Sequence, residues 1–218
     1  MRFPTFRRMA RNLPPITSPY DVFIRPLEWM GLRRARGALW SRLPEGAPGL
    51  EIGAGTGANL PYYPQDGLVV VTDVSPRAIR HVRRKRPSSS PPLVVADARM
   101  LPFRTDAFAW VAATLVFCEV GSPVAGLMEA RRVLRRDGVV ALLEHVRPRG
   151  VLGVLADALT RLTAPIWGEH FDRDTARNVE LAGFAVERRH AWLRGGLVLL
   201  FARPHPMSGA RPTGDRTL

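Results

Sequence analysis

A glycine-rich stretch and three acids are the residues of this sequence best suited to hold a ligand. The stretch "LEIGAGTG" at 50–57 contains Glu51 within an apolar run, followed by three glycines at alternate positions. Asp73 ends a second apolar run, and Asp97 ends a third. Glycines have no side chain, so a ligand can lie against their main chain, and carboxylates accept hydrogen bonds from its hydroxyl or amino groups. We therefore expect a flat, polar ligand beside these residues.

The spacing of the acids indicates which groups of a ligand they could bind. Glu51 stands two residues before the first glycine, where a carboxylate suits an ammonium group and would not help to bind a pyrophosphate. Asp73 follows Gly53 by twenty residues, the position from which an acid accepts hydrogen bonds from ribose hydroxyls. Asp97 can accept a hydrogen bond from an adenine amino group, with the Ala98 amide facing the ring. The simpler interpretation of Asp73 and Asp97 is that they cap a helix or form a turn.

The glycine spacing by itself does not identify the ligand. Gly53, Gly55 and Ala58 also satisfy the G-x-G-x-x-A variant of the dinucleotide fingerprint. A nicotinamide or flavin cofactor therefore remains an alternative on this stretch alone, and its ribose would use the same acid. Glu51 suits an ammonium group instead, and acids at the ends of two successive runs are a more specific signal than one.

Two histidines are candidates for a catalytic base. His145 ends a later apolar run in "LLEHV", and His170 lies in "WGEHFD" ahead of an amphipathic segment. Either imidazole could accept a proton from a thiol, phenol or ammonium group, or orient a substrate. The simpler interpretation is that His145 bonds to backbone and His170 shapes a loop. Glu144 should point to the other face of the strand, and Cys118 is more typical of a small buried hydrophobe. We expect no metal site.

The elements that position these residues follow from the alternation of apolar and amphipathic segments, which is typical of a parallel sheet covered by helices. The predicted strands are 48–53, 68–73, 92–97, 108–116, 138–145, 185–192 and 197–203. The last two are separated only by 193–196, which is too short for the crossover that parallel neighbours need. They should form an antiparallel hairpin, which is not the arrangement of a dehydrogenase's dinucleotide domain.

The helix boundaries carry ordinary signals. Pro76 and Pro123 each follow a serine, which predicts a capping hydroxyl and then a proline at the first helical position. We predict that Asp137-Gly138 ends the helix that starts at 123, and that Gly183 ends the next one.

Composition predicts one folded domain. The chain has 218 residues, of which 46% are hydrophobic and 23% charged. A single cysteine excludes an internal disulfide and favours a reducing cytoplasm. The basic start lacks the apolar segment of a signal peptide. Residues 151–167, the longest apolar candidate, contain charges and a proline and are too short to span a bilayer.

The formal charge of +13 is concentrated in two stretches. Residues 1–42 hold nine Arg and two acids, a net of +7, and residues 77–86 hold six basic residues and no acid, a net of +6. Such stretches suit an anionic partner, either nucleic acid or an anionic membrane surface. The alternative is an ordinary arginine-rich surface, since Lys85 is the one lysine of the chain.

Several motifs together resemble the class I S-adenosylmethionine-dependent methyltransferases over nearly the whole chain. They are "LEIGAGTG", Asp73, "ADA" at 96–98, "FAWVAATLVF", "LMEARRVLRRDG" and the terminal hairpin. The resemblance implies an α/β fold with a Rossmann-like, seven-stranded, mostly parallel sheet, an antiparallel last strand and an N-terminal helical extension. It also implies S-adenosylmethionine as the cofactor.

The resemblance assigns roles to residues of the site. The glycine loop with Glu51 would hold the methionine part and Asp73 the ribose, while Asp97 with Ala98 would hold the adenine. Tyr20 would lie over the cofactor from an N-terminal helix, with core packing as the alternative. The implied cofactor-binding residues, of which the last two line the bottom of the site, are Tyr20, Glu51, Gly53, Ala54, Gly55, Thr56, Gly57, Asn59, Asp73, Val74, Asp97, Ala98, Thr114 and Leu115.

A closer resemblance lies in "GTGANLPYYP", "TLVFCEV", "LLEHVRP" and "GEHFDRDTARNVELAGF". These are similar to a subgroup that contains membrane-associated thiol methyltransferases and lies near the phospholipid and quinone methyltransferases. Related sequences tend to have Cys where this chain has Glu169, so any role of that thiol is absent. The resemblance implies methyl transfer to a small apolar or amphiphilic acceptor, which would be a thiol, a phospholipid amine or a quinone-like oxygen.

Two other functions stay open at this point. The charge favours an RNA methyltransferase, although "TLVF" stands where enzymes that methylate base amines often have a polar-Pro-Pro-aromatic tetrapeptide, which makes nucleic acid the less favoured partner. A nicotinamide-dependent oxidoreductase is the other alternative. We expect a small-molecule or lipid acceptor, a cytoplasmic location and peripheral contact with an anionic membrane, and leave the oligomeric state open. The predicted parts are a basic helical extension at 1–43, the methyltransferase domain at 44–203 and a flexible tail at 204–218.

Overall fold

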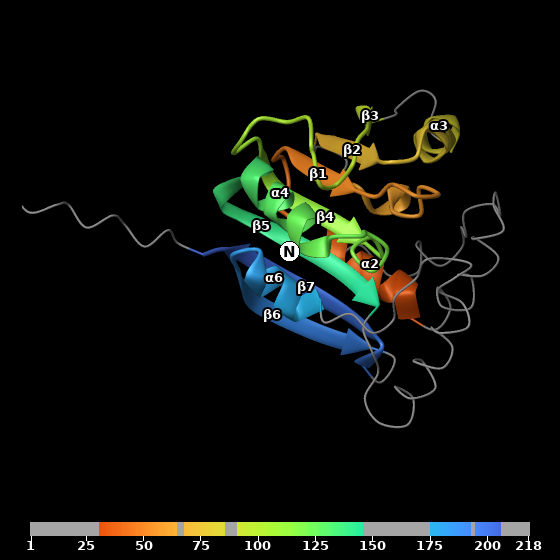
Figure 1. The fold of residues 1–218 in the computed structure, drawn as a ribbon. Coiled ribbons are helices and arrows are strands. Elements are labelled where there is room, and N and C mark those ends of the chain that lie inside the picture. The colour runs from red at the N-terminus through yellow and green to blue at the C-terminus, as the bar shows by residue number, and fades with distance from the viewer. Residues whose placement is uncertain (1–30, 65–67, 86–90, 146–174, 193–194, 206–218) are drawn as a thin grey trace, which may run out of the picture.

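The computed structural model describes residues 31–64, 68–85, 91–145, 175–192 and 195–205 (Figure 1). In chain order the elements are α2 (Arg33–Trp40), β1 (Gly49–Ile52), the 3₁₀ helix η2 (Leu60–Tyr62), β2 (Val69–Asp73), α3 (Pro76–Lys85), β3 (Leu93–Val95), β4 (Phe108–Thr114), α4 (Pro123–Val133), β5 (Leu134–His145), α6 (Thr175–Leu181), β6 (Phe184–Trp192) and β7 (Leu197–Pro204).

The strands form one seven-stranded sheet in the order β3-β2-β1-β4-β5-β7-β6. Strands β1 to β5 are parallel to one another, whereas β7 is antiparallel to both β5 and β6. At the hairpin end, Trp192 pairs with Leu197. The predicted mostly parallel sheet with a terminal antiparallel hairpin is therefore confirmed.

The core lies on both faces of the sheet. Along β4, Trp110 and Ala112 belong to one buried cluster and Val111 and Ala113 to the other, because successive side chains of a strand point to opposite faces. Helix α2 packs into the first cluster, and α4 and α6 pack into the second. Burial on both faces explains why the central strands appear as continuous apolar runs in the sequence.

One predicted helix end is wrong. Helix α4 ends at Val133, and the chain continues directly into β5, so Asp137-Gly138 lies within a strand. The register with β4 shifts there, since Leu134 pairs with Phe108 while the residue five positions later pairs with Trp110. A Cβ on Gly138 would lie 2.6 Å from Cδ1 of Leu134, so this glycine permits close packing at a bulge and does not end a helix.

The other helix boundaries agree with the predictions. Helices α3 and α4 begin at the expected prolines. The Ser75 hydroxyl accepts a hydrogen bond from the Ala78 N–H at 3.3 Å, whereas the Ser122 side chain makes no capping bond. Gly183 follows α6 with φ of +86°, in the left-handed region that favours glycine.

Helix α2 is the described part of the predicted extension at 1–43. Its Leu39 and Trp40 are buried in the same cluster as Trp110 of the central sheet. The boundaries of the extension and of the tail stay predictions. Within the described ranges, none of the helices combines the length and apolar character needed to cross a bilayer.

Candidate active site

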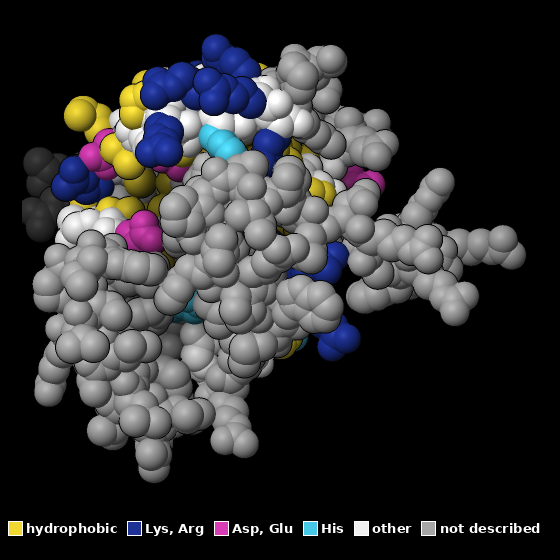
Figure 2. All heavy atoms as spheres, turned by 90° about the vertical axis from the view of Figure 1, so that its right-hand side faces the viewer, with side chains coloured by type: hydrophobic (Ala, Val, Ile, Leu, Met, Phe, Trp, Pro, Cys, Tyr) yellow, Lys and Arg dark blue, Asp and Glu magenta, His cyan; other side chains and the backbone are white. Residues whose placement is uncertain are grey.

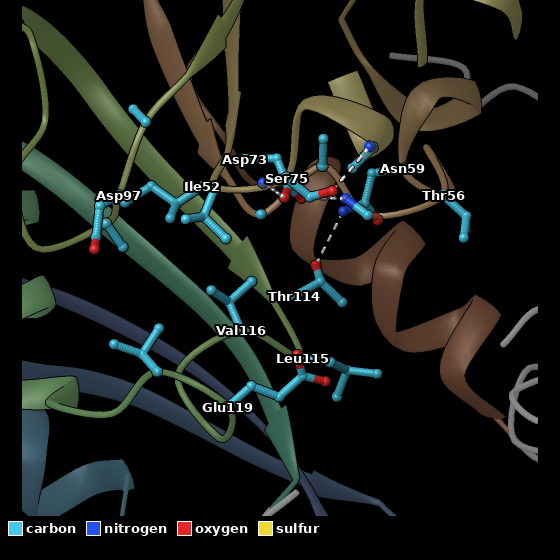
Figure 3. Close-up of a pocket in the computed structure, with 18 of the residues that line it drawn as sticks. Ile52, Thr56, Asn59, Asp73, Ser75, Asp97, Thr114, Leu115, Val116 and Glu119 are labelled. Carbon is cyan, nitrogen blue, oxygen red and sulfur yellow. Dashed lines mark hydrogen bonds between the residues drawn. The ribbon is translucent and has the colours of Figure 1, made fainter. Parts of the chain in front are cut away.

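A cavity of about 850 Å³ opens at the carboxyl edge of the sheet. Its walls come from the segments that follow β1, β2, β3 and β4, because parallel strands end at the same edge. Figure 3 shows Asp73 and Asn59 on one side of this cavity and Asp97 on the other, with Leu115, Val116 and Glu119 below. The structure thus brings the glycine loop and two of the three acids to one cavity.

The glycine loop needs its glycines for different reasons. Gly53 and Gly55 have φ of +79° and +50°. A Cβ on Gly53 would lie 2.3 Å from Cγ2 of Val116, so a side chain there has no room. A Cβ on Gly55 would meet nothing within 4 Å, so this residue keeps the backbone open toward the cavity. The N–H groups of Gly53 and Ala54 both donate to the Thr72 carbonyl, at 2.8 and 2.9 Å.

Asp73 ends β2 at the cavity wall, between the glycine loop and α3. Its Oδ2 accepts the Gly55 N–H at 2.8 Å, and its Oδ1 accepts the Ser75 N–H at 2.8 Å. The second bond is the turn interaction that the simpler interpretation predicted. Each oxygen keeps a further lone pair for a ligand hydroxyl. The turn role and a binding role are therefore compatible.

Asp97 lies two residues beyond β3, in a turn closed by the bond from the Met100 N–H to the Asp97 carbonyl at 2.9 Å. Its carboxylate pairs with the Arg99 guanidinium through contacts of 2.7 to 3.1 Å, and this hydrogen bonding lowers the pKa of Asp97. Ala98 beside it is buried. An adenine amino group would therefore share this carboxylate with Arg99, a residue that sequence analysis did not select.

Glu51 does not face the cavity. It is 1% exposed and absent from the described residues that line the space. Asn59 Nδ2 donates to Glu51 Oε1 at 2.5 Å and to Thr114 Oγ1 at 3.2 Å, and the Tyr63 hydroxyl donates to Glu51 Oε2. Burial, opposed in part by the Asn59 hydrogen bond, raises the pKa of Glu51 to about 8. Asn59, and not Glu51, presents its side chain to the cavity.

Arg36 is a cavity residue that sequence analysis missed. It lies on α2, is 6% exposed, and its Nη1 donates to Asn59 Oδ1 at 2.6 Å. A single chain of contacts thus joins Arg36, Asn59 and Glu51. Nothing in the sequence distinguishes this arginine from the exposed Arg34 on the same helix.

The bottom of the cavity is the loop after β4, and a buried glutamate holds it. Leu115 lines the cavity with φ of +56°, which is unusual for a residue other than glycine. Glu144 accepts the N–H groups of Val116, Phe117 and Cys118 at 3.1, 3.0 and 3.2 Å. Burial raises the pKa of Glu144, and these donors partly oppose the rise.

His145 lies at the end of β5, beside Leu197 of β7, and is half-buried. It is absent from the described residues that line the cavity. Burial and then the nearby Arg36 charge lower the pKa of His145 to about 4, so the imidazole is neutral at pH 7. The other predicted catalytic residue, His170, and the predicted cofactor residue Tyr20 lie outside the described residues.

Most of the predicted cofactor-binding residues meet at the cavity. Those that line it are Gly53, Ala54, Gly55, Thr56, Asn59, Asp73, Val74, Asp97, Ala98, Thr114 and Leu115. Glu51 and Gly57 do not, and the Glu119 carboxylate, which sequence analysis did not select, does. In the part of the chain that the structure describes, no group of three or more His, Cys, Asp or Glu side chains could hold a metal ion.

Comparison with known proteins adds to this geometry. The family model described as "Methyltransferase domain" matches residues 50–142. The thiol S-methyltransferase TMT1B of Rattus norvegicus is 31% identical over 177 residues, which cover 74% of this chain and 69% of that protein. The phosphatidylethanolamine N-methyltransferase of Cereibacter sphaeroides is 31% identical over 144 residues, covering 64% of this chain and 65% of that one.

The fold also matches solved structures. A putative methyltransferase, solved in complex with the Haloferax volcanii Trm112 methyltransferase activator, superposes with a TM-score of 0.68 at 16% identity. The match covers 85% of this chain and 94% of that one. At this identity the likeness concerns the fold.

Proposed function

This chain belongs to the methyltransferase family, and from that premise we propose that it transfers the methyl group of S-adenosylmethionine to a small apolar or amphiphilic acceptor. It is an enzyme, and S-adenosylmethionine is its methyl donor. The accepting atom in this proposal is a thiol sulfur, a phospholipid amine or a quinone-like oxygen. The observation that carries the proposal is the Asp73 carboxylate, held by two N–H groups at the wall of a cavity that the glycine loop leaves open.

The donor fits the residues of this cavity. In the proposed arrangement the ribose hydroxyls bind the remaining lone pairs of Asp73, and the methionine part lies along the open backbone near Gly55. The adenine lies between the exposed Val74 and the Asp97-Ala98 turn. The loop after β4 forms the floor.

Glu51 acts indirectly in this arrangement. Its carboxylate lies behind Asn59, so it positions the Asn59 amide at the cavity wall and does not contact the ammonium group of the donor. An ammonium group bound nearby would favour the ionised form of Glu51, because opposite charges attract more strongly in a buried site. Donor binding should therefore be coupled to release of a proton from Glu51.

S-adenosylmethionine supplies a methyl group on a sulfonium, which is an electrophile with a good leaving group. The protein therefore has to align the acceptor with the methyl group and exclude water. Alignment of this kind is worth about 7–11 kcal/mol of barrier. In the proposed arrangement, donor and acceptor meet between the cavity floor at Leu115 and the glycine loop.

A protonated acceptor must also lose its proton. We keep His145 and His170 as the candidate bases. With a pKa of about 4, the His145 imidazole is neutral at pH 7 and can accept a hydrogen bond, although it is a weak base. Its contribution should therefore be modest.

The class of acceptor is supported by the relatives. One is named a thiol S-methyltransferase and another a phosphatidylethanolamine N-methyltransferase. The proposal also places this protein in the cytoplasm, in peripheral contact with a membrane surface. A lipid or thiol acceptor agrees with that location. An oxidoreductase is not favoured by any of these matches.

The proposal is tested by turnover of a labelled methyl donor against thiols, phospholipids, quinols and total RNA. Label should pass to one of the first three classes. Label in RNA would support the competing RNA methyltransferase. Calorimetry should show binding of S-adenosylmethionine and of S-adenosylhomocysteine, and a protein that binds neither would contradict the proposed site.

A further inference from the structure

Helix α3 carries a concentrated positive surface. Four of its ten residues are exposed arginines, namely Arg77, Arg80, Arg83 and Arg84. At about 100° per residue they fall within an arc of about 120°. The buried Ile79 and Val82 lie on the opposite side of the helix, so the arc faces away from the core.

The four arginines, which we call the α3 arginine face, have no acidic partner among the described residues. Helix α3 itself contains no Asp or Glu. Like charges three or four residues apart on a helix repel one another, as at Arg80 and Arg84. The free protein therefore bears a local repulsion that an anionic surface would relieve.

Helix α3 borders the cavity with its inner side, which is opposite to the α3 arginine face. Helix α3 begins directly after Ser75, and both Ser75 and Ala78 line the cavity. Lys85 Nζ at the end of the helix donates to the Thr56 carbonyl in the glycine loop, at 2.6 Å. In Figure 2, which looks at the carboxyl edge of the sheet, Lys and Arg side chains gather along the top, where α3 lies in Figure 1.

We propose that the α3 arginine face docks on an anionic lipid bilayer and so holds the helix that borders the active-site cavity against the lipid. Guanidinium groups bind phosphate in a bidentate manner, and each basic side chain near an anionic leaflet adds to binding. The inference rests on the proposed function, in which the acceptor is apolar or amphiphilic and therefore partitions into or onto a bilayer.

A bilayer fits this face better than a nucleic acid does. The four arginines project from one convex helix, which matches a plane of headgroups. Val74, which stands just before the helix and lines the cavity, is an exposed apolar side chain, and it suits the interface of a bilayer better than a phosphate backbone.

The test is flotation of the full chain with phosphatidylcholine vesicles, with and without phosphatidylglycerol. The test variant is Arg80→Glu with Arg84→Glu. The matched control is Arg135→Glu with Arg136→Glu, which reverses two exposed arginines at the start of β5, on the opposite edge of the sheet. Thermal melting checks that both variants fold.

The wild type should bind the phosphatidylglycerol vesicles and lose binding as salt rises. The α3 variant should bind more than about tenfold less tightly, and the control variant should lose less than about threefold. Equal binding to phosphatidylcholine alone, or equal losses in the two variants, would overturn the proposal. Tighter binding to a homopolymeric RNA than to the vesicles, lost in the α3 variant, would assign the face to nucleic acid instead.

Failure of this inference can be distinguished from failure of the proposed function. Calorimetric titration with S-adenosylhomocysteine needs no vesicles and should give the same affinity for the wild type and the α3 variant. If the wild type binds vesicles and not this ligand, the proposed function is wrong while the docking surface stands. If it binds the ligand and not the vesicles, the docking surface is wrong.

Discussion

The carboxyl ends of β1 and β5 each carry a fully buried glutamate, and the two are satisfied in different ways. Glu51 on β1 accepts hydrogen bonds from two side chains, those of Asn59 and Tyr63. Glu144 on β5 accepts three from the backbone N–H groups of consecutive residues. Burial raises the pKa of both carboxyls.

This difference makes Glu51 a responsive group, whose charge can change when a ligand binds, and Glu144 a fixed anchor of the main chain. Glu51 lies one side chain away from the cavity and belongs to a network with Arg36, so its charge can respond to a ligand. Glu144 holds the main chain of the loop that forms the cavity floor, and main-chain donors cannot rotate away. Two glutamates of similar burial at the same edge of the sheet therefore have unlike roles.

The largest effect should come from the anchor. Glu144→Ala leaves three N–H groups, two of them buried, without an acceptor, and we expect it to lower the free energy of unfolding by about 4 kcal/mol. Glu144→Gln keeps one oxygen and should lose about half as much. Urea unfolding measures both. The control is Glu180→Ala on the exposed side of α6, which should change stability by less than about 0.5 kcal/mol. If the Glu144 and Glu180 variants were equally stable, Glu144 would not act as an anchor, and its contrast with the responsive Glu51 would be lost.

The next effect concerns Glu51 and pH. Because its folded pKa is about 8 and its ordinary value is 4.5, the folded state holds the proton more tightly than the unfolded state. The stability from this group is fully present below pH 4.5 and is lost as the pH rises through 8, by at most about 1.4 kcal/mol per pH unit. Glu51→Gln should remove this component, a difference of roughly 3 kcal/mol between about pH 5 and about pH 7.5.

Urea unfolding of donor-free protein at several pH values measures that difference. Wild type and variant share His145, whose lowered pKa acts in the opposite direction by favouring the folded state as the pH rises from about 4 to 6.5. Its contribution cancels in the comparison. Identical pH profiles for the two proteins would show that Glu51 ionises as an ordinary carboxyl and would weaken the distinction from Glu144.

A smaller effect should appear in the affinity for the donor when Asp73 or Asp97 is replaced. We expect Asp73→Ala to weaken binding of S-adenosylhomocysteine by more than about tenfold, since the proposed charged acceptor of the ribose hydroxyls is lost. Asp97→Ala should cost about threefold, because its carboxylate is partly exposed and already paired with Arg99. Calorimetry measures both affinities. If Asp97→Ala weakened binding more than Asp73→Ala did, the main contact with the ligand would lie in the turn after β3 and not at the end of β2.

The smallest effect should be the loss of turnover rate caused by replacing His145 at the end of β5. His145→Gln should slow turnover of a thiol acceptor by about fivefold, because a neutral and weakly basic imidazole contributes less than a well-matched base. Affinity for S-adenosylhomocysteine should stay within about twofold. Single-turnover rates and calorimetry separate the two. Parallel losses in rate and affinity would give His145 a structural role like that of Glu144.

Much of the fold could be predicted because its signals are local. The hairpin of β6 and β7 follows from a connection too short for a crossover, and the starts of α3 and α4 follow from Ser-Pro pairs. The end of α4 could not be predicted, because Asp-Gly serves equally at a helix end and at a strand bulge. Packing of Gly138 against Leu134 decides between them, and that contact depends on the neighbouring strand.

The sequence by itself determined the glycine loop, the positions of Asp73 and Asp97 and the edge of the sheet at which they meet, since residue type, spacing and the alternation of segments are enough for these. Only the tertiary structure decided that Arg36 reaches Asn59, that Asn59 stands in front of Glu51, and that Glu144 anchors the cavity floor. The Arg36 and Glu144 contacts join residues 23 and 27 positions apart in the sequence. Which side chain stands between the buried Glu51 carboxylate and the cavity depends on how helices and loops pack over the sheet.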